Sequence, residues 1–133
     1  MNNPKLLRNI DYICLYVSDI NESIKFYRDI LGLKPSNINE DSITSTWYSF
    51  KTGQTILALE RDGVRKVGIK TKAENPVLFQ FKLKTSEKLS QMNRHLEENG
   101  VILADCSKAT DYGLITNFSD PDGNKIEIIV NKV

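Results

Sequence analysis

Residues 10–17 alternate between mainly aliphatic positions and mainly aromatic or thiol positions, and this period of two predicts a β-strand. The two faces of the strand are formed by Ile13, Leu15 and Val17 and by Tyr12, Cys14 and Tyr16. The second face is aromatic and thiol-bearing rather than charged, so we expect it to lie against something other than open solvent.

The period changes to that of an amphipathic helix directly after this strand. Apolar side chains then recur at helical spacing, at Ile24, Tyr27, Ile30 and Leu31. Asp19 or Asn21 can cap the amino terminus of the helix, because short polar side chains accept hydrogen bonds from its first free amides. Gly32 follows the last apolar position, where helices commonly end with a left-handed residue.

Two further strands are expected in the first half of the chain, at residues 43–50 and 55–60, joined by a turn at 51–54. The later strand has one face with Leu57 and Leu59 and another with Ile56, Ala58 and Glu60. Residues 36–42 are predicted to form a loop, and the basic segment 61–75 a solvated connector.

The second half of the chain repeats this order. Residues 77–83 predict a strand with Leu78 and Gln80 on the same face, and residues 86–98 predict a helix. Short strands are expected at 101–104 and 114–118, with a loop at 105–111 between them. The repetition predicts two modules of strand, helix and three strands that jointly bury their sheets.

The final predicted strand lies within residues 118–130, and a turn introduces it. Pro121 and Gly123 favour a tight turn because of the backbone angles that each of them supports. After the turn, Glu127 falls on the face opposite to Ile126 and Ile128. A carboxylate in the middle of a last strand is therefore the first candidate for site chemistry.

Composition narrows the classes of function. Apolar residues make up 40% of the 133 residues and charged residues 26%, which is ordinary for a globular protein. A net charge of +1 provides no field for nucleic acid or for an anionic membrane. No stretch resembles a signal peptide or a membrane span, so we expect a cytoplasmic protein, and its two cysteines are expected to be free thiols.

The single histidine, His95, lies in the middle of the second predicted helix and is expected to face solvent. Catalytic zinc, iron and copper sites commonly use two or more imidazoles. One chain therefore cannot supply a two-histidine metal site.

Two segments resemble the signature segments of the vicinal oxygen chelate superfamily, which includes glyoxalases, bleomycin-resistance proteins, extradiol dioxygenases and fosfomycin-resistance enzymes. They are residues 12–33, with Phe-Tyr and Leu-Gly-Leu, and residues 118–129, with the Asp-Pro-Asp-Gly turn before Ile-Glu. The resemblance implies an α+β fold in which two βαβββ modules form a curled mixed sheet around a central cavity. It implies one domain over residues 1–133, with module 1 at about 8–62, a linker at about 63–75 and module 2 at about 76–133.

In the metalloenzymes of that superfamily the cavity resembles a site of two histidines and one or two carboxylates. Matched residue by residue, the metal-ligand positions fall on Tyr12, on Ala58 (or Glu60 after a slip of two residues), on Leu78 or Gln80, and on Glu127. Only Glu127 retains the residue type of the ligand. The resemblance therefore implies a divergent member without the metal-binding histidines, so no cofactor is expected and a divalent metal is disfavoured.

The side chains on the sheet faces opposite the helices are expected to line the cavity and bind a ligand. They are Tyr12, Cys14, Tyr16, Trp47, Ala58, Glu60, Leu78, Gln80 and Glu127. Tyr112 joins them because Tyr112-Gly113 resembles the aromatic–glycine pair at the cavity mouth of the family. The face of Trp47 is not fixed by the pattern, since Tyr48 and Phe50 alternate against it.

An aromatic wall that contains a carboxylate favours a small aromatic or cationic ligand. We therefore expect a metal-free binding protein similar to bleomycin-resistance proteins, which sequesters such a compound as an antibiotic-resistance device. Its expected partners are that small molecule and a second copy of the chain, with no nucleic acid and no membrane.

Three alternatives are left open by the sequence. The same side chains can fill the interior, with Glu127 bonded to a tyrosine hydroxyl or to Lys82. The chain can be an enzyme, either a divergent metal-dependent lyase or dioxygenase, or a metal-free isomerase that uses Tyr12 and Glu127 as an acid–base pair. It can also be a regulatory module kept for dimerisation.

Cys14 is expected to be an inert buried thiol rather than a nucleophile, because no matched histidine can activate it.

Overall fold

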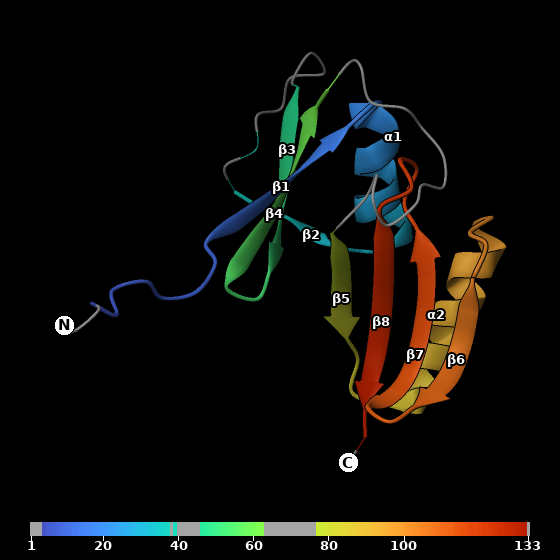
Figure 1. Ribbon diagram of the computed structural model, residues 1–133. Coiled ribbons are helices and arrows are strands. Elements are labelled where there is room, and N and C mark those ends of the chain that lie inside the picture. Colours follow the sequence, from blue (N-terminus) through green and yellow to red (C-terminus); the bar gives the residue numbers. More distant parts are fainter. Residues whose placement is uncertain (1–3, 38, 40–45, 63–76, 133) are drawn as a thin grey trace. The chain divides into compact units, whose positions relative to one another are not determined.

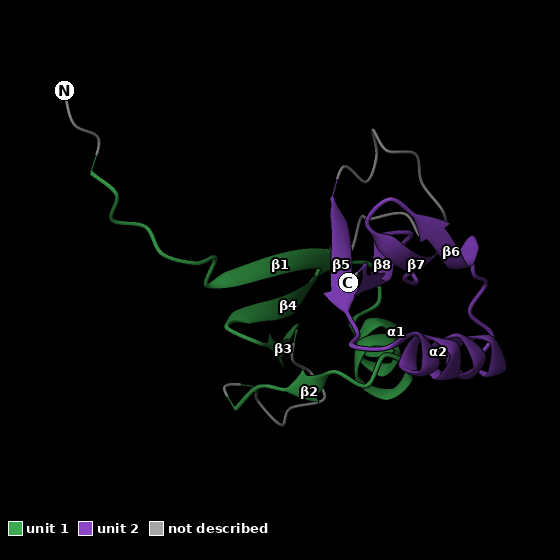
Figure 2. Ribbon diagram, turned by 90° about the horizontal axis from the view of Figure 1, so that it is seen from below, with its two compact units in different colours: residues 1–63 green, residues 64–133 purple. Residues whose placement is uncertain are grey.

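The computed structural model describes residues 4–37, 39, 46–62 and 77–132, and the remaining residues are drawn in grey in Figure 1. The chain divides into two compact units, unit 1 with residues 1–63 and unit 2 with residues 64–133 (Figure 2). Each unit contains one four-stranded mixed sheet and follows the order strand, helix and three strands. This arrangement confirms the predicted α+β fold of paired βαβββ modules.

Unit 1 is built on a sheet with strand order β1-β4-β3-β2. Its elements are β1 (Tyr12–Val17), α1 (Ile20–Ile24), the π-helical segment η1 (Lys25–Ile30), β2 (Lys34–Pro35), β3 (Trp47–Thr52) and β4 (Thr55–Arg61). β1 runs parallel to β4, whereas the other neighbours are antiparallel. Tyr27 of η1 is fully buried, and its ring lies 6.2 Å from that of Phe50 on β3, so the helical segment covers one face of this sheet.

The ends of the first helix follow the predicted chemistry. Of the two possible caps, Asp19 serves, because its carboxylate accepts a hydrogen bond from the backbone amide of Glu22 at 3.1 Å. At the other end Gly32 has a φ of +75°, a left-handed conformation that side chains resist. The π-helical turn at Lys25–Ile30 was not predicted from the spacing.

Unit 2 repeats the plan on a sheet with strand order β5-β8-β7-β6. Its elements are β5 (Leu78–Lys82), α2 (Ser86–Glu98), β6 (Asp105–Thr110), β7 (Gly113–Ser119) and β8 (Lys125–Asn131). Thr85 caps α2 by accepting from the amide of Lys88 at 3.2 Å. Leu89 and Leu96 of α2 are fully buried, so this helix covers one face of the sheet, as Figure 1 shows.

The predicted strand at 101–104 and the predicted loop at 105–111 are wrong. Residues 101–104 close the helix instead, because the amide of Val101 donates to the carbonyl of Leu96 at 3.0 Å. The strand is β6, which lies at the edge of the sheet and pairs only with β7. Its register shifts between Asp105 and Lys108, and Ser107 has a φ of +49°. An edge strand with a bulge lacks the alternation on which the prediction relied.

The predicted strand at 43–50 is shifted along the chain. β3 begins at Trp47 and continues to Thr52, so the turn before β4 shrinks to Gly53 and Gln54. Residues 43–45 and most of the predicted connector at 61–75 lie outside the described residues. None of the helices in the described part of the chain has the length and apolar character that crossing a bilayer requires.

Candidate functional site

The sheet face opposite the helix, called here the open face, gathers the six residues that the sequence singled out in unit 1. Strand register pairs Cys14 with Ala58 and Tyr16 with Glu60. The same register places Trp47 beside Glu60, which resolves the face of this tryptophan. The six residues on the open face of unit 1 are Tyr12, Cys14, Tyr16, Trp47, Ala58 and Glu60.

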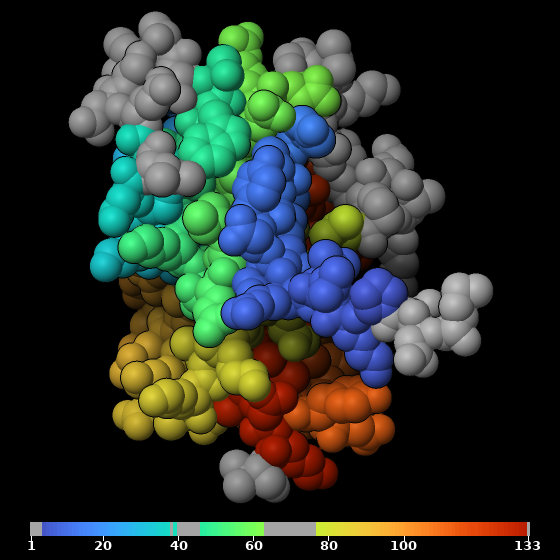
Figure 3. Space-filling model, turned by 90° about the vertical axis from the view of Figure 1, so that its left-hand side faces the viewer, coloured from blue at the N-terminus to red at the C-terminus, as the bar shows by residue number. Residues whose placement is uncertain are grey.

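One row of this face holds a carboxylate between two aromatic residues. Glu60 lies on β4, with Tyr16 of β1 on one side and Trp47 of β3 on the other. Side chains directly opposite on neighbouring strands have Cβ atoms roughly 5 Å apart. Tyr16 is 55% exposed, and in Figure 3 the residues of β1, in blue, lie at the surface. Aromatic faces and a carboxylate both attract a cation, so the row is suited to one.

The next row of the open face of unit 1 is made of small side chains. Cys14, Ala58 and Ser49 follow one another across β1, β4 and β3. Burial, and after it the negative charge of Glu60, raises the pKa of the Cys14 thiol above its ordinary value. The thiolate is therefore disfavoured, although Cys14 is half-buried rather than buried as expected, and its inertness stays a prediction.

The open face of unit 2 carries a polar row with one side chain from each of the four strands. The row consists of Gln80 on β5, Glu127 on β8, Asn117 on β7 and Asp105 on β6. The side-chain amide of Gln80 donates to Oε1 of Glu127 at 3.1 Å. The amide of Asn117 donates to Oδ2 of Asp105 at 2.8 Å. Each carboxylate in the row is thus held by an amide from a neighbouring strand.

Two members of this row, Asn117 and Asp105, were not predicted as site residues from the sequence. Asp105 was assigned to a loop because the edge strand β6 lacks an apolar period. Asn117 had a usable signal in the sequence, because it alternates with the apolar Phe118, which is buried in the structure. A side chain adjacent to a helix-facing residue must point to the open face.

The remaining predicted residues of unit 2 lie elsewhere. Leu78 shares the open face but stands beside Lys125, two positions along β5 from the partner of Glu127. Tyr112 is 76% exposed in the turn between β6 and β7, where its amide donates to Thr110 at 3.2 Å. The structure therefore does not bring Tyr112 onto the open face of unit 2.

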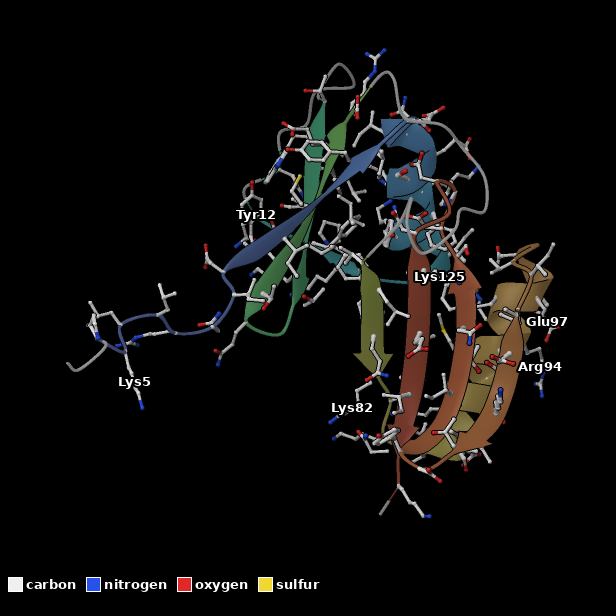
Figure 4. All side chains as sticks on the ribbon, in the orientation of Figure 1. Lys5, Tyr12, Lys82, Arg94, Glu97 and Lys125 are labelled. Carbon is white, nitrogen blue, oxygen red and sulfur yellow. The ribbon has the colours of Figure 1, made fainter. Side chains whose placement is uncertain are left out.

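Two lysines flank the Gln80–Glu127 pair. Lys125 precedes Glu127 by two residues on β8, and Lys82 follows Gln80 by two residues on β5. In Figure 4 the two labels stand toward opposite ends of these paired strands. Among the described residues neither lysine forms an ion pair with Glu127, whose carboxylate is bonded to Gln80 instead.

The turn before β8 fixes the position of Glu127 and has no evident chemical role. Asp120 is buried, and its carboxylate accepts from the amides of Asp122 and Asn124 and from the side chain of Asn124, at 2.8–2.9 Å. Gly123 completes the turn with a φ of +85°. This satisfied turn sets where β8 starts and hence its register with β5.

The open faces do not fit the metal site that the family resemblance implies. Within the described ranges no three His, Cys, Asp or Glu side chains lie together. The one retained carboxylate, Glu127, already accepts a hydrogen bond from Gln80, and its other neighbours on the row carry no imidazole. His95 is exposed on α2 and lies 3.5 Å from the amide of Asn99. Such a set of donors is a poor match for a transition metal.

A groove of about 560 Å³ lies in unit 2 between α2 and β6, on the helix side of the sheet. It is lined by Ser90, Asn93, Arg94, Glu97, Glu98, Cys106 and Ser107. Figure 4 shows Arg94 and Glu97 on α2. None of the predicted site residues lines this groove, so the candidate site stays on the open faces.

Comparisons with known proteins agree with this fold. A family model described as the Glyoxalase/Bleomycin resistance protein/Dioxygenase superfamily matches residues 9–128. YraH of Bacillus subtilis is 31% identical over 87% of this chain and 93% of its own length. The metallothiol transferase FosB of Staphylococcus epidermidis is 30% identical over 92% of this chain and 81% of its own. TnmS3, an antibiotic binding protein from Streptomyces sp. CB03234, shares the fold with a TM-score of 0.73 at 20% identity, over 97% of this chain and 100% of its own.

Proposed function

Because the chain belongs to the glyoxalase/bleomycin resistance protein/dioxygenase superfamily, we propose that it binds a small aromatic or cationic compound without a metal ion. The site proposed for the ligand is the open face of unit 1. The observation that carries this proposal is the row in which Glu60 lies between Tyr16 and Trp47. Sequestration of the compound, as in an antibiotic-resistance protein, is the biological role that we infer.

The chemistry of the row supports a cationic aromatic ligand over a neutral or anionic one. A cation placed over an aromatic ring gains about 0.5–2 kcal/mol, depending on how far it is removed from water. The charge of Glu60 adds to this attraction, while the rings of Tyr16 and Trp47 offer apolar surface to a planar ligand. TnmS3, which shares the fold, is an antibiotic binding protein, and a sequestering role here is consistent with that description.

The test uses the only tryptophan of the chain, Trp47, as a reporter. Titration with basic aromatic compounds, including basic aromatic antibiotics, is expected to give a saturable change in its fluorescence. Glu60→Gln should weaken binding about tenfold, equivalent to about 1.4 kcal/mol, because it removes the charge and keeps the shape. Glu22→Gln on α1, an exposed carboxylate of the same unit, is the matched control and should bind as the wild type does.

Two results would count against this proposal. One is the absence of saturable binding across a broad panel of such compounds. The other is equal affinity of the wild type and Glu60→Gln, which would place the ligand away from the row.

An enzyme is the competing function, supported by the 30% identity to the metallothiol transferase FosB. It would be a divergent lyase, dioxygenase, isomerase or group transferase of the same superfamily. Elemental analysis of the purified protein separates the two functions. Stoichiometric nickel, zinc, manganese or iron that disappears in Glu127→Ala would favour a metal-dependent enzyme, whereas its absence supports metal-free binding.

We also propose that the chain forms a homodimer in the cytoplasm. Large apolar side chains exposed on the described residues, such as Leu6, Leu7 and Ile102, favour association over a lone monomer. Light scattering on the purified protein should then give twice the chain mass of 15.1 kDa.

A further inference from the structure

We infer that Gln80 takes the place of a metal ion at Glu127, and that the Gln80–Glu127 pair receives an N–H-bearing cationic group such as an amidinium or a guanidinium. This inference rests on the proposed function, since it assumes that the open faces bind a small cation. It assigns to unit 2 a contact with a definite hydrogen-bond geometry, in addition to the aromatic row of unit 1.

The first support is the geometry of the pair. Gln80 and Glu127 are direct partners in the parallel pairing of β5 and β8, and the amide donates to Oε1 at 3.1 Å. An ionised carboxylate has about four lone-pair sites on its two oxygens, and the amide N–H of Gln80 occupies one of them, on Oε1. A transition metal at Glu127 would receive no nitrogen ligand from Gln80, because an amide N–H is a donor and cannot ligate a cation.

The second support is that two hydrogen-bond acceptors of the pair remain available to a ligand. Within the described part of the chain, Oε2 of Glu127 and the amide oxygen of Gln80 take part in no other hydrogen bond. Asn117, the other neighbour of Glu127, directs its amide to Asp105 instead. Two acceptors on strands roughly 4.8 Å apart suit a planar group with several N–H donors.

The third support is charge. Lys82 and Lys125 stand on the same face on either side of the pair. The two ammonium groups repel any cation, but the repulsion is twice as strong for a divalent ion as for a monovalent one, so a metal ion is disfavoured more than an amidinium. A monovalent amidinium also forms charge-assisted hydrogen bonds to Glu127.

Two aromatic cations distinguish this contact from the row in unit 1. Benzamidine carries an amidinium with N–H donors, whereas benzyltrimethylammonium is a cation without any. Calorimetry should show that Glu127→Gln and Gln80→Leu weaken benzamidine binding at least tenfold and change benzyltrimethylammonium binding less than twofold. Glu98→Gln, an exposed carboxylate on α2, is the matched control and should leave both affinities unchanged.

The outcomes separate the two proposals. Wild-type affinity of both variants for benzamidine would overturn this inference and leave the proposed function standing. Failure of the wild-type protein to bind either cation would overturn the proposed function and this inference together. Equal weakening of both ligands would mean that the variants act through the fold, and it would also overturn the inference.

A second arm tests the exchange of metal for amide directly. Gln80→His places an imidazole beside the carboxylate, and its Ni²⁺ affinity should exceed that of the wild type at least tenfold. The double variant Gln80→His with Glu127→Gln should lose this gain, which shows that the ion binds at the pair. Stoichiometric Ni²⁺ binding by the wild type that is lost in Glu127→Gln would contradict the inference.

Discussion

At the scale of single residues, neighbouring strands decide what a side chain on the open face can do. Cys14 faces the same side as Glu60, and both burial and that carboxylate favour its protonated form. Glu127 is affected by its neighbour Gln80, whose side-chain amide donates a hydrogen bond to one of the carboxylate oxygens. Neighbouring side chains thus make Cys14 a weaker nucleophile and make Glu127 a hydrogen-bond acceptor.

Cys14 should react slowly with alkylating reagents, because only the thiolate attacks them and the thiolate is disfavoured here. Glu60→Gln removes the second cause of the raised pKa, so alkylation of Cys14 by iodoacetamide should accelerate at a fixed pH. Peptide mass spectrometry over a pH series measures the rate at Cys14 separately from that at the exposed Cys106.

The pH dependence has a definite sign. Because the folded chain holds the proton of Cys14 more tightly than the unfolded chain does, this group stabilises the fold at low pH. That contribution to stability is lost as the pH rises above the ordinary pKa of a thiol, about 8.5–9.

Two results of the alkylation experiment would contradict the raised pKa of Cys14. One is an alkylation rate at Cys14 that is unchanged in Glu60→Gln, and the other is a rate equal to that of Cys106 throughout the pH series.

Alternation along strands carried most of the residue-level prediction. It placed Tyr12, Cys14 and Tyr16 on one face because β1 is regular, and the register of β3 then added Trp47. It could not show that Gln80 is the partner of Glu127, since pairing between β5 and β8 joins segments 47 residues apart. Tyr112 was included by resemblance alone, and it lies in a turn.

At the scale of elements, α2 is fixed to its sheet by a polar contact as well as by an apolar one. Asn93 is buried in α2, donates to the hydroxyl of Ser107 on β6 at 2.8 Å and accepts from that of Thr116 on β7 at 2.7 Å. The amide of Ser107 in turn donates to the Thr116 hydroxyl at 3.0 Å. This network holds the bulge of β6 against the helix.

Asn93→Ala should lower the free energy of unfolding by about 2 kcal/mol, because the buried hydroxyl of Thr116 and the half-buried hydroxyl of Ser107 each lose a hydrogen bond to Asn93. Urea denaturation measures the loss, and Gln91→Ala, an exposed change on the same helix, should cost less than about 0.5 kcal/mol. Combined with Thr116→Val, the loss should be smaller than the sum of the two single losses, since both variants break one network. Additive losses would show that the network does not act as a unit.

The same network explains why β6 was missed in the sequence. An apolar strand is recognised by alternation, but Ser107 contacts the helix through a hydroxyl and lies within the register shift between Asp105 and Lys108. The long helix α2 was predicted with its observed bounds, because its helical period and the Gly100 that follows it agree, and the structure adds the Thr85 cap. Elements supported by several local signals were predictable, whereas those held by tertiary polar contacts were not.

At the scale of the whole molecule, the repeat of strand, helix and three strands could be predicted from the sequence. Each half has its own helical period and its own turn before the last strand. The two halves differ in what they display. The open face of unit 1 is aromatic around Glu60, and that of unit 2 is polar around Glu127. The two repeats thus display unlike chemistry on the same scaffold, aromatic in unit 1 and hydrogen-bonding in unit 2.

A ligand that binds only the folded chain must raise its melting temperature by mass action. At a concentration 100 times its dissociation constant it adds about 2.7 kcal/mol, which for a chain of 133 residues corresponds to roughly 8 °C. In Glu60→Gln, with affinity about tenfold weaker, the same concentration adds about 1.4 kcal/mol and roughly 4 °C.

EDTA should leave the melting temperature of the wild type unchanged, because the proposed site contains no metal. A fall with EDTA that Mn²⁺ or Ni²⁺ reverses would instead mean that a metal stabilises the fold, and the metal-free function would then be wrong.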